Sequence, residues 1–212
     1  DASAYIIEIK SDYIQEALPI ILGTLVNKNS TNNITIRPEL GVTNLSFLNT
    51  GTENDVFVLS SANYLTIDGR PGGVGSNDFS IENNQTAKGH ALKIEGSCTE
   101  INLNYLSFKG SNQSPDLGPL STDAGVILIG ESGSGIISDI NINYCEIGKS
   151  SGGIPTYLVS SYSASGSVTN CSLKNSALSD ASRKYIQLYT NTSDWEISSN
   201  HFYQTTTFTP PS

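Results

Sequence analysis

The chain has 212 residues, of which eleven are basic and twenty are acidic, and its formal net charge at neutral pH is −9. A chain this acidic lacks the basic footprint that nucleic-acid binding requires, and none of its apolar runs approaches the roughly 18–20 residues of a membrane-spanning helix. We therefore expect one sizeable domain with a real hydrophobic core, with neither a nucleic-acid partner nor insertion into a membrane.

Short strand-like runs follow one another along the chain. Residues 5–9 read as an opening strand. Residues 13–22 are ambiguous, because their Gln-Glu-Ala-Leu segment favours a helical turn, whereas Pro19 and the β-branched residues after it favour a strand. Further apolar runs typical of strands are found at residues 45–48, 55–59, 79–81, 91–94, 126–129, 157–159 and 185–189.

A five-residue phrase is repeated along this series. Asn63-Tyr64-Leu65-Thr66-Ile67 recurs at residues 104–108 and 143–147, and looser copies occupy residues 32–36, 169–173 and 199–203. In most copies the third and fifth residues are apolar and the fourth is small and polar, which is the period of a strand with one face in a core. Equivalent residues of successive copies are 26 to 41 positions apart, a spacing typical of solenoids.

These copies predict an all-β fold, a parallel β-helix of about six to seven coils with loops of unequal length inserted between them. We expect the copies to stack in register, so that Leu65, Leu106 and Cys145 form one inward line. Residues 1–204 would be a single domain and residues 205–212 a tail or linker. No capping helix is evident at either end, so we expect the chain to be part of a longer multidomain polypeptide.

Cys145 and Cys171 occupy the same position of adjacent copies, which predicts neighbouring thiols in the core. They can be buried free thiols that act as small apolar side chains. A disulfide between stacked coils is the alternative, since adjacent strands lie about 4.8 Å apart. The number and spacing of the three cysteines do not resemble a zinc site.

Residues 34–39, 64–73 and 143–148 resemble right-handed parallel β-helix (pectate-lyase-like) regions of large secreted or surface proteins of Bacteroidetes-type bacteria. The resemblance covers nearly the whole chain. It implies a right-handed solenoid that is exported to the cell surface or the medium, often beside adhesion or sorting modules. The family includes polysaccharide lyases and hydrolases as well as proteins without known chemistry, so the fold alone does not select an activity.

Residues suited to polysaccharide cleavage are sparse. A pectate-lyase-type elimination needs a base and usually calcium on an acidic cluster. Asp116 and Asp123, in the longest loop, are the weak candidates for calcium, and we expect no other metal or cofactor. We expect His201 at an inward position and His90 at a solvated strand entrance, so the sequence supports neither a Ser-His-Asp triad nor a paired-carboxylate hydrolase.

Two rows of side chains are candidates for ligand binding. If the copies stack, Tyr64, Tyr105 and Tyr144 form an outward column, which is either a platform for sugar rings or a protein partner, or a structural ladder of packed tyrosines. Basic residues just past the strands would meet carboxylates or sulfates of an acidic glycan, or would merely solubilise the turns. These basic residues are Arg37, Arg70, Lys109, Lys149 and Lys174.

The sequence thus favours a non-catalytic module of the cell surface or the medium. It would be structural and adhesin-like, with polysaccharide or a surface protein bound along one flank. A purely structural segment of a long adhesin is a second hypothesis. The third is a lyase or glycoside hydrolase acting on acidic polysaccharide, in which the loops 110–125 and 148–155 wall a groove over the basic row.

Overall fold

The computed structural model describes residues 4–15, 17–24, 28–51, 55–113, 125–130 and 135–205. Within these ranges the chain is all-β, with twenty strands, one 3₁₀ turn, η1 (Pro71–Gly73), and no α-helix. The described ranges accordingly contain no helix that could cross a bilayer. Of the two alternatives for residues 13–22, the structure shows the strand, at Ile20–Leu22, and no helical turn is found in the described part of that segment.

The strands form three parallel sheets. Sheet 1 contains β1 (Tyr5–Ile9), β3 (Ile34–Pro38), β6 (Asn63–Asp68), β9 (Thr99–Asn104), β12 (Ile136–Asn143), β15 (Ser167–Thr169), β16 (Cys171–Lys174) and β19 (Trp195–Ser198). Sheet 2 contains β4 (Leu45–Asn49), β7 (Phe79–Asn83), β10 (Ser107–Gly110), β13 (Glu146–Lys149), β17 (Ala177–Ser179) and β20 (His201–Tyr203). Sheet 3 contains β2 (Ile20–Leu22), β5 (Phe57–Ser60), β8 (Leu92–Glu95), β11 (Ile127–Ile129), β14 (Tyr157–Ser161) and β18 (Lys184–Leu188).

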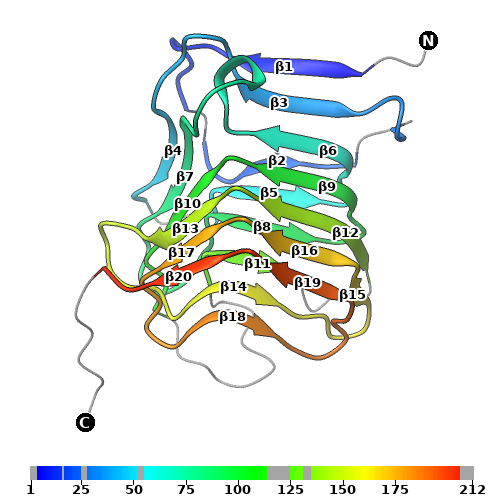
Figure 1. Cartoon of the computed structure of the whole chain (residues 1–212), viewed down its shortest axis with the longest axis vertical. Coiled ribbons are helices and arrows are strands. Elements are labelled where there is room, and N and C mark those ends of the chain that lie inside the picture. Colours follow the sequence, from blue (N-terminus) through cyan, green and yellow to red (C-terminus); the bar gives the residue numbers. More distant parts are fainter. Residues whose placement is uncertain are drawn as a thin grey trace.

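The chain visits the three sheets in turn. In one round, β6, β7 and β8 pair in parallel with β3, β4 and β5 of the round before and with β9, β10 and β11 of the round after. Figure 1 shows the strands of each sheet stacked like rungs, with β1 at one end. This order is that of a parallel β-solenoid. It confirms the predicted all-β fold of stacked parallel strands, and the main path of sheet 1 has seven strands.

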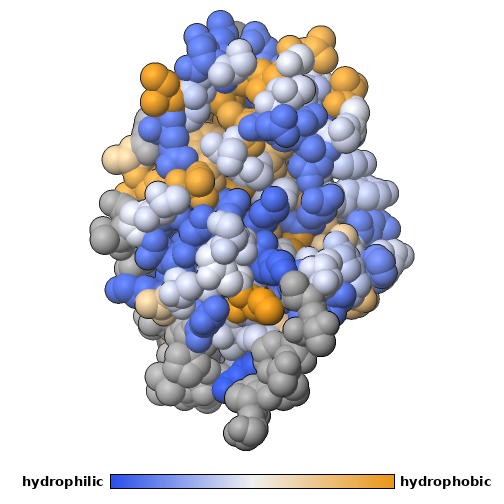
Figure 2. Space-filling model, turned by 90° about the vertical axis from the view of Figure 1, so that its left-hand side faces the viewer, coloured by the Kyte–Doolittle hydropathy of each residue, from blue (hydrophilic) through white to orange (hydrophobic). Residues whose placement is uncertain are grey.

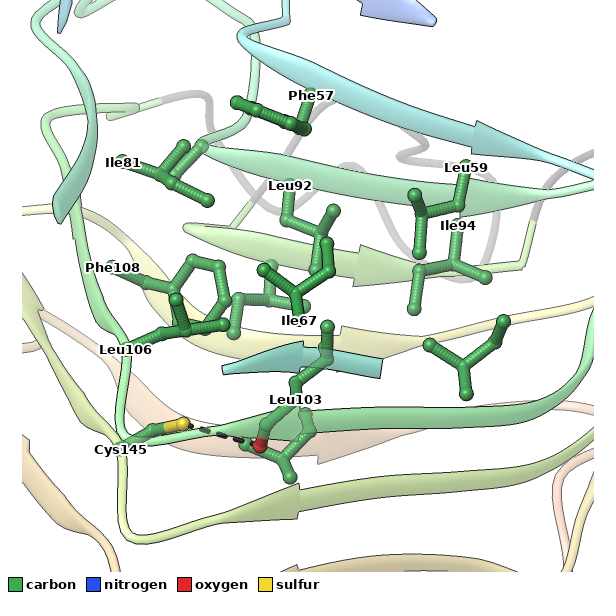
Figure 3. Packing of buried hydrophobic residues seen from close by; sticks show 14 of the residues in the cluster. Phe57, Leu59, Ile67, Ile81, Leu92, Ile94, Leu103, Leu106, Phe108 and Cys145 are labelled. Atoms are coloured by element: carbon green, nitrogen blue, oxygen red, sulfur yellow. Dashed lines mark hydrogen bonds between the residues drawn. The ribbon is translucent and has the colours of Figure 1, made fainter. Parts of the chain in front are cut away.

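Inward side chains of all three sheets form one hydrophobic core. On sheet 1, Ile67 pairs with Leu103, which pairs with Ile142, and all three are buried. Figure 3 shows Ile67 and Leu103 packed against inward residues of the other two sheets, such as Phe108 and Leu92. Burying an aliphatic or aromatic side chain contributes about 1.5–3 kcal/mol, so the stacked core holds the coils together.

The predicted register between the repeated phrases is confirmed for two neighbouring pairs of copies and wrong for the rest. Ile34 pairs with Leu65, and Ser107 pairs with Glu146, as predicted. Leu65 pairs with Ile101 of β9 and not with Leu106, whereas Leu106 and Cys145 lie at the corner before sheet 2. The copies at 32–36, 63–67 and 169–173 lie on sheet 1, but those at 104–108, 143–147 and 199–203 lead into sheet 2. The physical reason is that all three sheets face the same core, so the same apolar–polar–apolar pattern suits strands on any of them.

The three cysteines, Cys98, Cys145 and Cys171, are buried and free, in agreement with the prediction of buried thiols for the last two. They are not at equivalent positions, however, because Cys145 lies at a corner and Cys171 opens β16 on sheet 1. Burial raises the pKa of Cys145 to about 12 and that of Cys98 and Cys171 to about 11. All three are therefore protonated and unreactive at neutral pH.

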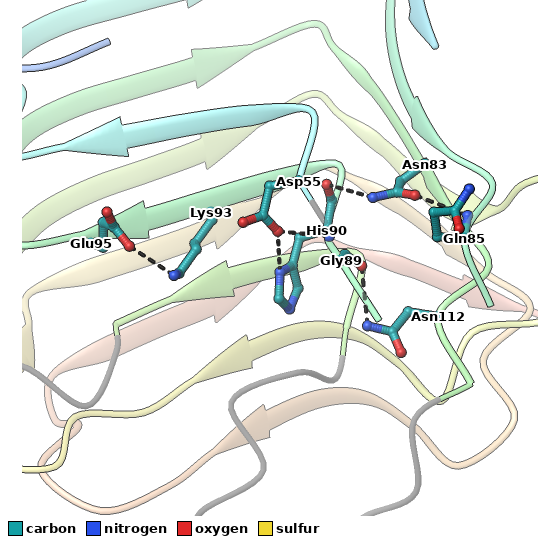
Figure 4. Close-up of polar contacts among 8 residues, drawn as sticks. All are labelled: Asp55, Asn83, Gln85, Gly89, His90, Lys93, Glu95 and Asn112. Atoms are coloured by element: carbon teal, nitrogen blue, oxygen red, sulfur yellow. Dashed lines mark hydrogen bonds and ion pairs between the residues drawn. The ribbon is translucent and has the colours of Figure 1, made fainter. Parts of the chain in front are cut away.

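The expectations for the two histidines are both wrong. His90 is buried, and its Nδ1 lies 2.8 Å from Oδ1 of Asp55, which also accepts the backbone N–H of His90 at 3.0 Å. The side-chain amide of Asn83 donates to the carbonyl of His90, as Figure 4 shows. His201 points outward on β20, is exposed, and stacks on Tyr203 with ring centroids 4.9 Å apart.

Candidate functional site

A shallow groove crosses the outer face of sheet 2. It has a volume of about 310 Å³ and lies over β4, β7, β10 and β13. A smaller hollow of about 80 Å³ continues it over β17 and β20 and shares Ser107, Lys109 and Glu146 with it. We call the two together the sheet-2 groove. Since neighbouring strands lie about 4.8 Å apart, six strands make it roughly 24 Å long.

Strand register explains why this face is hollowed. Ser46, Ser80 and Ser107 are paired from strand to strand and form a row of short outward side chains along the floor. Longer side chains, Lys109 and Glu146, are also part of the lining. Figure 2 looks onto this side of the molecule, where the residues over the middle strands are mostly hydrophilic or of intermediate hydropathy. The groove therefore offers hydroxyl, amide, carboxylate and ammonium groups on a rigid sheet.

A stack of side chains stands at the corner between sheets 1 and 2, beside this floor. The rings of Tyr105 and Tyr144 are nearly parallel, with an interplanar angle of 12° and centroids 4.9 Å apart. Cζ of Arg70 lies 4.0 Å from the centroid of the Tyr105 ring. Both tyrosines have left-handed backbone angles, with φ of 53° and 54°, so each coil turns the corner through a single residue in this conformation.

Arg70 is held in place by its own loop. Its Nε and Nη2 donate to the two carboxylate oxygens of Asp68 at 2.9 and 2.8 Å, a bidentate arrangement. This hydrogen bonding raises the pKa of Arg70, which stays charged. The loop between Gly69 and Asp78 is closed by a bond of 3.0 Å from the backbone N–H of Asp78 to the carbonyl of Gly69. Asp78 then lines the groove.

Gly69→Ala tests how tightly the coils are stacked at this corner. A Cβ at residue 69 would lie 1.7 Å from the carbonyl oxygen of Tyr105, so the backbone itself must move. We expect the free energy of unfolding to fall by about 3 kcal/mol or more, at or above the upper end of ordinary overpacking. Urea denaturation measures it. Gly23→Ala, whose Cβ would meet nothing within 4 Å, is the control, and equal stability of the two variants would contradict the close approach.

The five basic residues do not form one line. Arg37 and Lys174 lie on sheet 1, Lys109 and Lys149 lie on sheet 2, and Arg70 lies at the corner between them. Four of the five are close to carboxylates of the chain itself, in the pairs Arg37–Glu8, Arg70–Asp68, Lys149–Asp180 and Lys174–Glu196. Lys109 is exposed and has no ion-pair partner among the described residues. The predicted continuous row is thus wrong, while binding of a ligand by any of these residues stays a prediction.

The predicted tyrosine column is present in part. Tyr105 and Tyr144 stack as expected, but Tyr64 lies on sheet 1 beside Glu100 and is not in that stack. The structure therefore brings Arg70, Lys109 and Lys149 together with two tyrosines around sheet 2. It leaves Arg37, Lys174 and Tyr64 on sheet 1.

The calcium candidates Asp116 and Asp123 lie outside the described residues. Among the residues that are described, no group of three or more His, Cys, Asp or Glu is placed to hold a metal ion. A calcium site consequently stays a prediction.

Sequence reasoning missed the serine floor. Its signal is a second repeated phrase, Leu-Ser-Phe, at residues 45–47 and 106–108, with Phe-Ser-Ile at 79–81 between them. These three segments pair with one another on sheet 2. The serine of each phrase is the outward residue, so this repeat gives the true register.

Comparison with models of known protein families, with curated proteins and with solved structures finds no match to this chain. The functional argument therefore depends on the geometry of the groove.

Proposed function

We propose that this chain is a non-catalytic extracellular or cell-surface module, a right-handed parallel β-helix that binds glycan along the sheet-2 groove. The observation that carries the proposal is the continuity of the groove. Hydroxyl and charged groups recur from strand to strand over six stacked strands, which suits a ligand made of repeated polar units. The single packed core beneath makes the floor rigid, so little conformational entropy is lost on binding.

The alternative is a lyase or glycoside hydrolase that acts on acidic polysaccharide. The observation in its favour is that Lys109 shares one groove with Asp78 and Glu146. Against it, the cations predicted to meet an acidic substrate are mostly paired with carboxylates of the chain itself. The binding module is the better account of the groove.

A location outside the cytoplasm agrees with the state of the cysteines. Their thiols are buried and their pKa values are raised, so they would resist oxidation in an oxidising compartment. Since buried free thiols suit reducing compartments as well, the secreted or surface location is proposed from the family resemblance.

Affinity electrophoresis through native gels containing single polysaccharides tests the proposal. We expect at least one polymer to retard the protein, and Ser46→Trp to weaken that retardation at least about tenfold, because an indole at this exposed floor position fills the groove. Ser165→Trp, an exposed serine between β14 and β15, is the matched control and should migrate as the unmodified chain does.

Two results would count against the proposal. Migration unaffected by every polymer in a broad panel would remove glycan binding. Release of ultraviolet-absorbing unsaturated ends from a uronate polymer incubated with the protein and calcium would establish the lyase instead.

A further inference from the structure

We propose that the sheet-2 groove selects a linear, uncharged glycan and that one of its sugar rings stacks on the open face of Tyr144. This inference rests on the proposed function and adds the chemical class of the ligand and the residue that anchors it.

The charges of the groove argue against a polyanion. Its main part is lined by two carboxylates, Asp78 and Glu146, and one ammonium group, Lys109. The outward neighbour of Lys109 on β7 is another carboxylate, Glu82. Lys149, on β13 in the smaller hollow, lies 3.9 Å from the buried carboxylate of Asp180. The whole chain carries a formal charge of −9, so its long-range field also repels anionic polymers.

The neutral groups of the groove suit sugar hydroxyls. Ser46, Ser80 and Ser107 recur at intervals of about 4.8 Å along the floor, and each hydroxyl both donates and accepts. The side-chain amides of Asn44 and Asn77 add donors and acceptors at the same end of the groove. A sugar hydroxyl also donates and accepts, so a glycan chain can satisfy these groups without a change of charge.

A peptide is less well suited to this surface. Strand addition requires a free sheet edge. At the β4 edge of sheet 2, the Gln15 amide already donates to the carbonyl of Leu48 at 3.1 Å and accepts its backbone N–H at 2.7 Å. A side-chain anchor requires an apolar pocket, but the apolar residues lining the main groove, Leu45 and Phe79, are buried in the core.

The stack at the corner leaves one aromatic face open. The Tyr105 ring is covered on both faces. Arg70, from the coil before it, lies over one face, and the ring of Tyr144, from the coil after it, stacks on the other. Tyr144 is 46% exposed. The next residue in its column is Asn175, whose short side chain donates to Oδ1 of Asn143 at 3.0 Å and so is held against the corner. The far face of Tyr144 is therefore available to an apolar sugar face, two residues before Glu146 of the groove.

The test compares neutral polymers (β-glucan, xylan and galactomannan) with acidic ones (polygalacturonate and alginate) in the same affinity gels. We expect retardation by a neutral polymer, unchanged between about 50 and 500 mM salt, because no ion pairs form with the ligand. Tyr144→Ala should weaken binding about tenfold, and Tyr144→Phe should retain it. Tyr64→Ala, on sheet 1, is the matched control, with the circular dichroism of each variant confirming the fold.

The outcomes separate this inference from the proposed function. Salt-sensitive binding to the acidic polymers alone would overturn the neutral ligand while glycan binding stands. Full affinity of Tyr144→Ala for the neutral polymer would overturn the stacking role. Failure of every polymer to bind would remove the proposed function and this inference with it.

Discussion

Phe108→Ala is expected to lower the free energy of unfolding by about 3–5 kcal/mol, the usual cost of truncating a buried phenylalanine. Phe108 is fully buried on β10 and is paired with Ile81 on one side and Ile147 on the other. Because inward residues of all three sheets surround it, the stacked coils have little freedom to close the cavity that alanine would leave (Figure 3). Urea denaturation followed by circular dichroism measures the loss.

The adjacent residue provides the control for this change. Lys109→Ala removes an exposed side chain from the outer face of the same strand and should change stability by no more than about 0.5 kcal/mol. A loss below about 1 kcal/mol for Phe108→Ala would mean that the Phe108 side chain does not point from β10 into the core.

Asp55→Ala is the second change with a large expected effect. It removes a carboxylate that accepts both Nδ1–H and the backbone N–H of His90, and hydrogen bonds to a charged group contribute about 1.5–3 kcal/mol. We expect a total loss of about 3 kcal/mol at neutral pH, measured by urea denaturation. Asp12→Ala, an exposed aspartate of the first turn, is the control and should be nearly neutral.

The same pair predicts how stability depends on pH. Burial acts to raise the pKa of Asp55, but the hydrogen bond from His90 and the charges of His90 and Lys93 outweigh it, and the pKa is lowered below its usual 3.8. A carboxyl whose pKa is lowered by folding stabilises the fold above its unfolded pKa, and this contribution is lost as the pH falls through the folded pKa. The stability difference between the unmodified chain and Asp55→Ala should therefore shrink below about pH 4. A difference that grows in acid would contradict this sign.

The sequence predicted the fold because the solenoid is built from local patterns. Alternation of apolar and small polar residues identifies short strands wherever they occur, and most of the predicted apolar runs overlap strands of the structure. The register was not accessible in the same way. Asn-Tyr-Leu at 63–65 and at 104–106 look alike, yet Leu65 points into the core from sheet 1 and Leu106 does so from a corner. The strand that pairs with β6 is β9, and the next is β12. Their alternating apolar residues, which the repeated phrase does not include, are Ile101, Leu103, Ile140 and Ile142.

Of the candidate site, the sequence predicted only the side chains that lie at the corner between sheets 1 and 2. Tyr105 and Tyr144 stack because each occupies the left-handed position at the corner before sheet 2. Tyr64 has the same place in the repeated phrase and is also left-handed, but it lies on sheet 1. The predictions for the two histidines were wrong for a different reason. Burial of His90 depends on Asp55, 35 residues earlier in the chain, and on a pairing that no local pattern specifies.

The closure of the loop between Gly69 and Asp78 has a consequence for how such a module could diversify. Since the N–H of Asp78 returns to the carbonyl of Gly69, the residues between them leave and rejoin the coil at one point, and the coils above and below are paired independently of the insertion. Pro71 is buried and η1 packs against β3, so this part of the loop belongs to the scaffold. Exchange of the exposed residues 74–76 for a segment of another length or composition would thus remodel the rim of the sheet-2 groove while the scaffold kept its packing. Ligand preference and folding stability could then change separately, in the way that antigen specificity is varied on an invariant framework.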